Sequence, residues 1–213
     1  MLDYCLVRQP VFAAEGTVLG YEIRFRDSDD GRHAFNQSFL SGTFDMVRGG
    51  LPAFLVCTRT QLLENAFQIV NPKHAILVLP PYLVADDKVV GAVKRFCASG
   101  GSIALDDITE EEAASEALIP YASWVRVDVR CEDAVAIGRV CDRVSSVGVA
   151  QSARLVADHV CEARQYLLAK QLGFDAFQGA FLSRPEPLTS TDLRQETEPA
   201  AGAGVDPASV GEY

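Results

Sequence analysis

The strongest constraint on the fold is a regular alternation of short apolar runs with helical patterns. The apolar runs fall at residues 53–57, 74–79, 102–107, 122–129, 153–157 and 176–182. The helical patterns fall at residues 33–49, 60–69, 86–98, 110–118, 132–144 and 159–172. Short strands that alternate with helices predict a parallel sheet with right-handed crossovers.

Two extended runs precede this alternation, at residues 4–12 and 17–26. The short gap between them contains Gly16, which predicts a β-hairpin and therefore an antiparallel first pair of strands. The total is about eight strands and about six or seven helices. That number of strands can close a barrel, and a doubly wound open sheet is the alternative α/β architecture.

The chain of 213 residues suits one domain with a short appendage. We expect a barrel domain over residues 1–187. Residues 188–213 are rich in Pro, Ala, Gly and Ser and carry five acids against the single Arg194. This segment lacks apolar periodicity and is predicted to be an acidic, flexible tail.

The formal net charge of −10 disfavours nucleic acid and anionic membrane surfaces as partners, because both require clustered Lys and Arg. A small phosphorylated ligand is still compatible with this net charge, since a few suitably positioned arginines can bind it. No apolar run approaches the roughly 18–20 residues of a membrane span, and no signal peptide opens the chain. We therefore expect no membrane insertion and a cytoplasmic location.

Cysteine and histidine give no sign of a zinc site. The six cysteines contain no Cys-x-x-Cys pair, and most lie in apolar runs, which predicts buried, reduced thiols. The three histidines (His33, His74, His159) are widely spaced and are interpreted as surface or core residues.

Asp106 and Asp107 end the apolar run that begins at Ser102. In a parallel barrel, the carboxyl ends of the strands surround the site where ligands and metals bind. A metal or ligand site is one interpretation of this acidic pair. The other is a solvated turn at a strand end, where Asp is common.

Six segments, in order along the chain, resemble EAL domains, the cyclic di-GMP phosphodiesterases, and most of all the EAL part of EAL–HDOD proteins. They are Arg8-Gln9-Pro10 with Gly20-Tyr21-Glu22-Ile23-Arg24-Phe25-Arg26, Leu105-Asp106-Asp107, Val125-Arg126-Val127-Asp128, Leu155-Val156-Ala157-Asp158-His159-Val160-Cys161, Gly173-Phe174-Asp175-Ala176-Phe177-Gln178-Gly179 and Arg184-Pro185. The resemblance implies a modified TIM (β/α)8 barrel whose first strand runs antiparallel.

The resemblance also implies hydrolysis of a phosphodiester by water that two divalent cations, Mg²⁺ or Mn²⁺, activate. It places Glu22, Asp106 and Asp107 as metal ligands. It implies ligand contacts for a second set of residues, namely Gln9, Arg26, Asp128 and Gln178.

Four positions depart from the family pattern. Val56 and Val78 stand where the family has an asparagine and a glutamate that bind metal, and a valine side chain offers no oxygen. Arg126 replaces the lysine of the Lys-Ile-Asp strand, a substitution that changes shape and hydration. Cys161 stands where a glutamate is expected to act on the water.

These departures predict a degenerate phosphodiesterase that is not an enzyme and needs no metal cofactor. We expect a non-catalytic regulator that binds a signalling protein, and a homodimer is an open alternative. A second prediction is a cyclic di-GMP receptor that binds without hydrolysis. A third is weak hydrolysis with Mg²⁺ or Mn²⁺.

Overall fold

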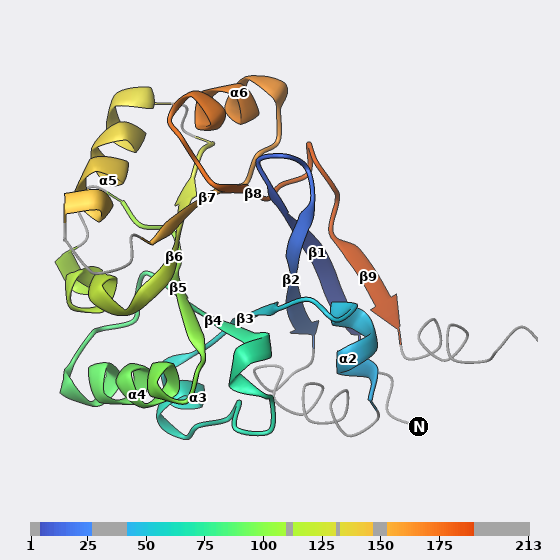
Figure 1. The fold of residues 1–213 in the computed structure, drawn as a ribbon, viewed down its shortest axis with the longest axis vertical. Coiled ribbons are helices and arrows are strands. Elements are labelled where there is room, and N and C mark those ends of the chain that lie inside the picture. The colour runs from blue at the N-terminus through green and yellow to red at the C-terminus, as the bar shows by residue number, and fades with distance from the viewer. Residues whose placement is uncertain (1–4, 27–41, 110–112, 131–132, 147–152, 190–213) are drawn as a thin grey trace, which may run out of the picture.

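The computed structural model describes residues 5–26, 42–109, 113–130, 133–146 and 153–189. Eight strands form a closed ring with helices on its outside (Figure 1). The strands are β1 (Cys5–Ala13), β2 (Val18–Arg26), β3 (Ala53–Val56), β4 (Ala75–Leu79), β5 (Ser102–Leu105), β6 (Ala122–Asp128), β7 (Arg154–Asp158) and β8 (Ala176–Phe177). The predicted barrel is confirmed, and the open sheet is excluded by the ring closure.

β1 closes the ring because it pairs antiparallel with β2 along one edge and with β8 along the other. The pairs from β2 to β8 are all parallel. The predicted antiparallel first pair is therefore confirmed. A bulge between Val11 and Phe12 shifts the register of β1 near the hairpin.

A ninth strand, β9 (Glu186–Thr189), pairs antiparallel with the first half of β1. Its Leu188 lies opposite Leu6 and is buried. The predicted tail from residue 188 therefore begins within a strand, and its residues 190–213 lie outside the described residues. The division of the chain at residue 187 stays a prediction.

The described helices cover the outside of the ring. They are α2 (Thr43–Arg48), α3 (Arg59–Leu63), η1 (Pro72–His74), α4 (Asp87–Ala98), η2 (Ala113–Tyr121), α5 (Ala134–Ser146) and α6 (Ala163–Gln171). Both α3 and α4 have clear cap signals at their starts. The carboxylate of Asp86 accepts hydrogen bonds from the backbone N–H groups of Lys88 and Val89, which starts α4. Thr58 and Gln61 form a capping box that starts α3.

Some elements are shorter than their sequence patterns. α3 ends at Leu63 rather than at residue 69, and β8 has two residues instead of seven. α6 starts at Ala163 because His159 adopts a left-handed backbone conformation, with φ 57°, and ends the preceding strand. Of the helix expected over residues 33–49, only the part from residue 42 lies within the described residues.

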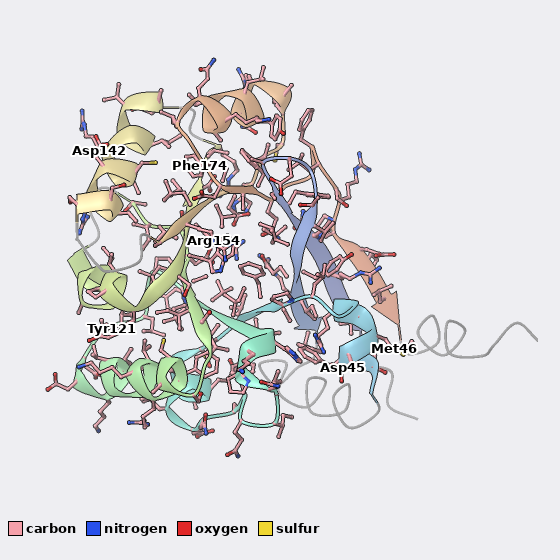
Figure 2. All side chains as sticks on the ribbon, viewed as in Figure 1. Asp45, Met46, Tyr121, Asp142, Arg154 and Phe174 are labelled. Carbon is pink, nitrogen blue, oxygen red and sulfur yellow. The ribbon has the colours of Figure 1, made fainter. Side chains whose placement is uncertain are left out.

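Alternation along the strands divides the apolar side chains between two cores. One face packs against the helices and forms the larger cluster, which includes Leu55, Leu77 and Leu105. The opposite face fills the ring itself (Figure 2) with a second cluster. This inner cluster comprises Val11, Phe54, Ile76, Val78, Ala104, Trp124, Val156 and Ala176. The barrel is therefore a packed core and not a pore.

Arg154 covers the amino end of the barrel interior. It is the first residue of β7, and its guanidinium lies 3.7 Å from the ring centroid of Trp124. Trp124 in turn contacts Phe54 edge to face. The opposite, carboxyl end of the barrel is where polar side chains gather.

Within the part of the chain that the structure describes, no helix has the length and apolarity needed to span a membrane.

We predict that Gly179→Ala destabilises the fold. A Cβ at residue 179 would lie 2.1 Å from the carbonyl oxygen of Val160 and 2.3 Å from its nitrogen, and backbone atoms cannot move aside cheaply. We expect a loss of about 2 kcal/mol or more in the free energy of unfolding, measured by urea denaturation.

Gly138→Ala, within α5, is the matched control for this substitution. A Cβ there meets nothing within 4 Å, so we expect a gain of up to about 1 kcal/mol. Equal stability of the two variants would contradict the close approach of residues 160 and 179.

Candidate functional site

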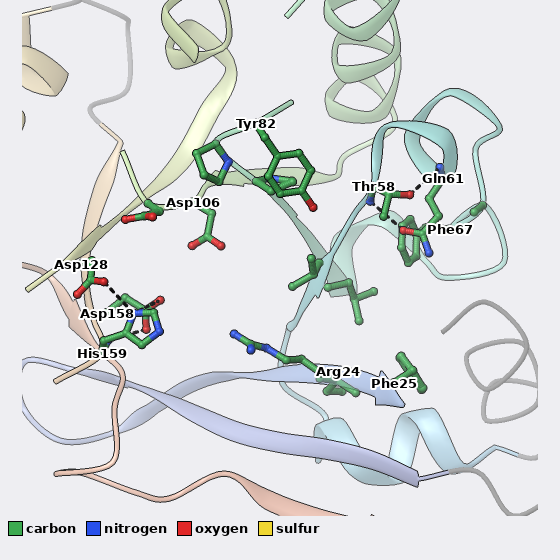
Figure 3. A pocket seen from close by; sticks show the side chains of 17 residues that line it. Arg24, Phe25, Thr58, Gln61, Phe67, Tyr82, Asp106, Asp128, Asp158 and His159 are labelled. Carbon is green, nitrogen blue, oxygen red and sulfur yellow. Dashed lines mark hydrogen bonds and ion pairs between the residues drawn. The ribbon is translucent and has the colours of Figure 1, made fainter. Parts of the chain in front are cut away.

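A pocket of about 450 Å³ opens at the carboxyl ends of the parallel strands (Figure 3). Its walls come from β2, β3, α3 and its flanking residues, the residues that follow β4 and β5, and the ends of β6 and β7. A volume of this size suits a small-molecule ligand. The pocket lies at the end of the barrel where the sequence predicts a site.

Four aspartates line one side of the pocket, namely Asp106, Asp107, Asp128 and Asp158. Asp106 continues the β5 ladder, since its N–H donates to the carbonyl oxygen of Leu79 at 2.9 Å. Asp107 turns the chain with φ 47°, a conformation that aspartate tolerates better than most residues. The predicted strand-end acids thus meet two further acids from the neighbouring strands.

His159 stands beside two of these acids. Its Nδ1 lies 3.6 Å from Oδ2 of Asp128 and 3.5 Å from Oδ2 of Asp158. Asp128 also accepts hydrogen bonds from the backbone N–H and the Nε of Arg130. Burial alone would raise the pKa of Asp128, but these bonds and the charges of His159 and Arg130 outweigh it and lower that pKa.

Arg24 supplies positive charge in the pocket. Its side chain is 58% exposed, and it points into the pocket toward the side that carries Asp158 and His159 (Figure 3). Its Nε donates to Oε1 of Glu22, two residues earlier on the same face of β2. This contact fixes the Nε end of the guanidinium, and the side chain as a whole stays accessible from the pocket.

A buried polar network lies beneath the pocket. Gln178 donates from Nε2 to Oε2 of Glu22 at 2.9 Å and to Oε1 of Gln9 at 3.3 Å. Gln9 in turn donates to the carbonyl oxygen of Ser183 at 3.0 Å. These bonds join β1, β2 and the segment after β8.

Arg126 is the centre of this network. Its side chain is 1% exposed, and its Nη2 lies 2.8 Å from Oε2 of Glu22 and 2.5 Å from Oδ2 of Asp158. The same nitrogen donates to Oε1 of Gln178 at 3.2 Å, and Nε lies 3.3 Å from Oδ1 of Asp106. One buried cation therefore contacts acids from three strands or strand ends.

The pKa values in the network follow from this crowding. Burial works to lower the pKa of Arg126, but Glu22, Asp158 and Asp106 reverse the effect and raise it. Burial works to raise the pKa of Glu22, but the charges of Arg126 and Arg24 outweigh it and lower that pKa.

Asp106 shows the opposite shift. Burial raises its pKa, and although the charge of Arg126 works against this effect, the charges of Asp158, Glu22 and Asp107 add to it. Glu22 is thus a stabilised anion, whereas Asp106 is an acid that holds its proton more tightly than usual.

The structure separates the predicted site residues into two groups. Asp106, Asp107, Asp128 and Val56 line the pocket, whereas Glu22, Arg126, Gln9 and Gln178 form the buried network below it. Val78 is fully buried in the inner apolar cluster, and exposed Cys161 donates its backbone N–H to Gln165. The side chain of Arg26 lies outside the described residues.

Sequence reasoning missed most residues that line the pocket, including Arg24, Tyr82, Asp158 and His159. Arg24 carried a signal, because it alternates with Glu22 and Arg26 on β2. Asp158 ends β7, a strand that held no predicted site residue. His159 was interpreted as a surface or core residue, and only the left-handed turn places it at the pocket. Tyr82 follows Pro80-Pro81 and carried no polar pattern.

The expectation of buried cysteines holds for Cys57 and Cys141 among the described residues, but not for Cys161. Burial raises the pKa of Cys57 to about 12, and burial together with the charge of Asp142 raises that of Cys141 to about 11. These thiols are unreactive packing residues.

Two curated relatives match most of the chain. The cyclic di-GMP phosphodiesterase CdgJ of Vibrio cholerae is 27% identical over 197 residues, which are 85% of this chain and 44% of CdgJ. The uncharacterized protein YuxH of Bacillus subtilis is 24% identical over 203 residues, 88% of this chain and 49% of YuxH. The chain thus spans about half the length of these relatives. No protein-family model matches it.

Solved structures share the fold. The MucR phosphodiesterase in complex with cyclic di-GMP has a TM-score of 0.70 at 17% identity, covering 86% of this chain and 97% of MucR. The YkuI protein of Bacillus subtilis, described as having an EAL domain, has a TM-score of 0.68 at 15% identity, covering 85% of this chain and 55% of YkuI. Its structure contains cyclic di-GMP and calcium.

The chain has the fold of an EAL domain. The antiparallel closure by β1 and the parallel ring from β2 to β8 are the modified barrel that the sequence resemblance implied.

The comparisons contradict the prediction that the chain is not an enzyme. CdgJ is named as a cyclic di-GMP phosphodiesterase, and MucR is named as a phosphodiesterase. The prediction rested on side chains missing at four positions. It gave no weight to Asp158 and His159, which the fold adds to the pocket beside Asp106 and Asp128.

The described residues nevertheless do not fit a divalent metal as they stand. Among them, no three or more His, Cys, Asp or Glu side chains converge so that they could hold a metal ion. The guanidinium of Arg126 already lies between Glu22, Asp106 and Asp158. The site chemistry is therefore that of an arginine–carboxylate cluster.

We predict opposite effects on stability for Glu22→Gln and Asp106→Asn, measured by thermal unfolding between pH 4 and pH 7. The pKa of Glu22 is lowered, so its charge stabilises the fold above the ordinary glutamate pKa, and this stability is lost as the pH falls through the lowered value. Glu22→Gln should cost about 3 kcal/mol at pH 7, since it removes a partner of buried Arg126.

The pKa of Asp106 is raised, so its ionised form opposes folding above that value. Asp106→Asn should leave the melting temperature unchanged or raise it at pH 7, and this advantage should shrink as the pH falls toward the ordinary aspartate range. Asp107→Asn, at the exposed neighbour, is the control and should change little. A large loss of stability in Asp106→Asn at pH 7 would refute this assignment.

Proposed function

We propose that this domain binds cyclic di-GMP in the pocket at the carboxyl end of its barrel and takes part in cyclic di-GMP signalling. The observation that carries the proposal is the pocket itself, with accessible Arg24 facing the aspartates across about 450 Å³. The similarity to MucR and YkuI, whose structures contain cyclic di-GMP, supports the choice of ligand.

The pocket offers contacts for each part of such a ligand. The guanidinium of Arg24 suits a phosphate, because a charge-assisted pair with two parallel N–H donors matches phosphate oxygens. Tyr82 is 75% exposed and lies across the pocket from Arg24 (Figure 3), where its ring can stack on a base.

The aspartates suit the guanine bases rather than the phosphates. A guanine edge presents N–H donors, and an ionised carboxylate accepts such donors on both oxygens. Asp128, whose pKa is lowered, is an acceptor of this kind on the pocket wall. In this arrangement the aspartates contact the guanine bases, and Arg24 contacts a phosphate.

Hydrolysis of a phosphodiester bond is the second candidate function, and the relationship to CdgJ favours it. Among the described pocket residues, Asp106 best fits the role of a base that accepts a proton from water. Burial raises its pKa above the ordinary aspartate value, and its side chain is 23% exposed. Arg24 would stabilise charge on the phosphate.

Three narrower expectations remain predictions. They are the likeness to the EAL part of EAL–HDOD proteins, the binding of a regulatory protein, and a homodimer. The net charge of −10 supports a protein partner with a basic face, because complementary potentials speed encounter.

We predict that calorimetric titration with cyclic di-GMP gives saturable binding at one site per chain. Arg24→Ala should weaken the affinity by about tenfold or more, because it removes a charged partner of the phosphate. Arg95→Ala, at an exposed arginine on α4, is the charge-matched control and should leave the affinity unchanged. Absence of binding at about 1 mM ligand would overturn the proposal.

Hydrolysis is tested separately, by chromatographic detection of the linear dinucleotide after incubation with cyclic di-GMP. We expect slow product formation that Asp106→Asn reduces by about a hundredfold or more. Because Asp107→Asn keeps Asp106 in place, it should retain most of the rate. Binding without any linear product would reject hydrolysis and leave the binding proposal standing.

A further inference from the structure

The guanidinium of Arg126 occupies a position surrounded by oxygen atoms. Its Nη2 has Oε2 of Glu22 at 2.8 Å, Oδ2 of Asp158 at 2.5 Å and Oε1 of Gln178 at 3.2 Å. Two carboxylates and an amide oxygen are the ligand types that Mg²⁺, Mn²⁺ and Ca²⁺ prefer. A fourth oxygen, Oδ1 of Asp106, lies 3.3 Å from Nε of the same arginine.

Charge, more than hydrogen-bond geometry, accounts for Arg126 at this position. Nε and Nη1 are buried and have no hydrogen-bond acceptor among the described residues. An arginine selected for its planar fork would use these donors. Here the hydrogen bonds and most of the ion pairs of Arg126 are made by the single nitrogen Nη2, so the side chain acts mainly through its positive charge.

The buried acids require a cation. Glu22 is 2% exposed and Asp158 7% exposed, and two neighbouring carboxylates without a positive partner would not both stay ionised in a buried site. Arg24 compensates one oxygen of Glu22 from the pocket side. The remaining negative charge is compensated by Arg126, which contacts Glu22, Asp158 and Asp106.

We propose that the Arg126 guanidinium is the resident cation of this domain and takes the place of a divalent metal between Glu22, Asp106 and Asp158. In the natural chain these three acids bind no Mg²⁺ or Mn²⁺. When the guanidinium is removed but the acids are kept, the same oxygens form a divalent cation site. This inference does not rest on the proposed function, since it concerns the acids and their cation alone.

The fold supports such an exchange. The four oxygen donors come from β2, the ends of β5 and β7, and the segment after β8, so the closed ring holds them in place without Arg126. Asp106 and Asp158 also line the pocket, which gives a metal ion a path from solvent. A shorter, apolar side chain at residue 126 would leave room for the ion and a water molecule.

The test uses Mn²⁺ alone as the probe, without nucleotide, on the full chain. Binding is measured by electron paramagnetic resonance and by the shift in melting temperature, and only binding that Glu22→Gln removes is counted. For the natural chain we expect no such binding at about 1 mM Mn²⁺ and a melting temperature that neither Mn²⁺ nor EDTA changes.

Arg126→Met should acquire one Glu22-dependent Mn²⁺ site, with a rise in melting temperature of about 5 °C or more at saturating metal. Arg95→Met, at an exposed arginine on α4, is the matched control, because it makes the same substitution away from these acids and should bind no Mn²⁺. If Arg126→Met does not fold in buffer, refolding on addition of Mn²⁺ supports the proposal, and failure to fold at about 10 mM Mn²⁺ overturns it.

Two other results would also overturn the proposal. One is a Glu22-dependent Mn²⁺ site in the natural chain. The other is a folded Arg126→Met variant that binds no Mn²⁺. Neither result bears on cyclic di-GMP affinity, so the proposed function and this inference can fail independently.

Discussion

The closure of the barrel by β1 is the constraint on which the rest of the structure depends. β1 pairs with β2 and β8 in the antiparallel sense, while every other neighbouring pair of the ring is parallel. Closure removes the free edges of the sheet and directs every second side chain into one enclosed space. The apolar side chains fill the middle and the amino end of this space, and the polar ones gather at its carboxyl end.

Enclosure explains why the polar residues form a network. A buried carboxylate or guanidinium is costly unless opposite charges and hydrogen bonds surround it. Glu22 and Asp158 meet this requirement through Nη2 of Arg126, and Gln178 donates a hydrogen bond to Glu22. The layer above them, with exposed Arg24 and Asp107 and with Asp128, is open to a ligand.

Much of the fold could be predicted from the sequence because the relevant signals are local. The hairpin before residue 26, the β–α alternation after residue 53 and the acids after Leu105 all depend on neighbours in the chain. The element ends were less predictable. α3 and β8 are short because tertiary packing, and not the apolar pattern, decides where a helix or strand stops. The non-enzyme prediction failed since it judged single positions without the pocket that the fold builds around them.

The sequence by itself determined the order of the first eight strands and of the helices between them, and that Glu22, Asp106 and Asp128 lie in or directly after strands. Only the tertiary structure decided that Arg126 meets Glu22 and Asp158, and that His159 turns to the pocket. Gln178 and Glu22 are 156 residues apart and bond because the ring closes in one register. The register of a closed sheet is set by all its strands together, so no local pattern can specify it.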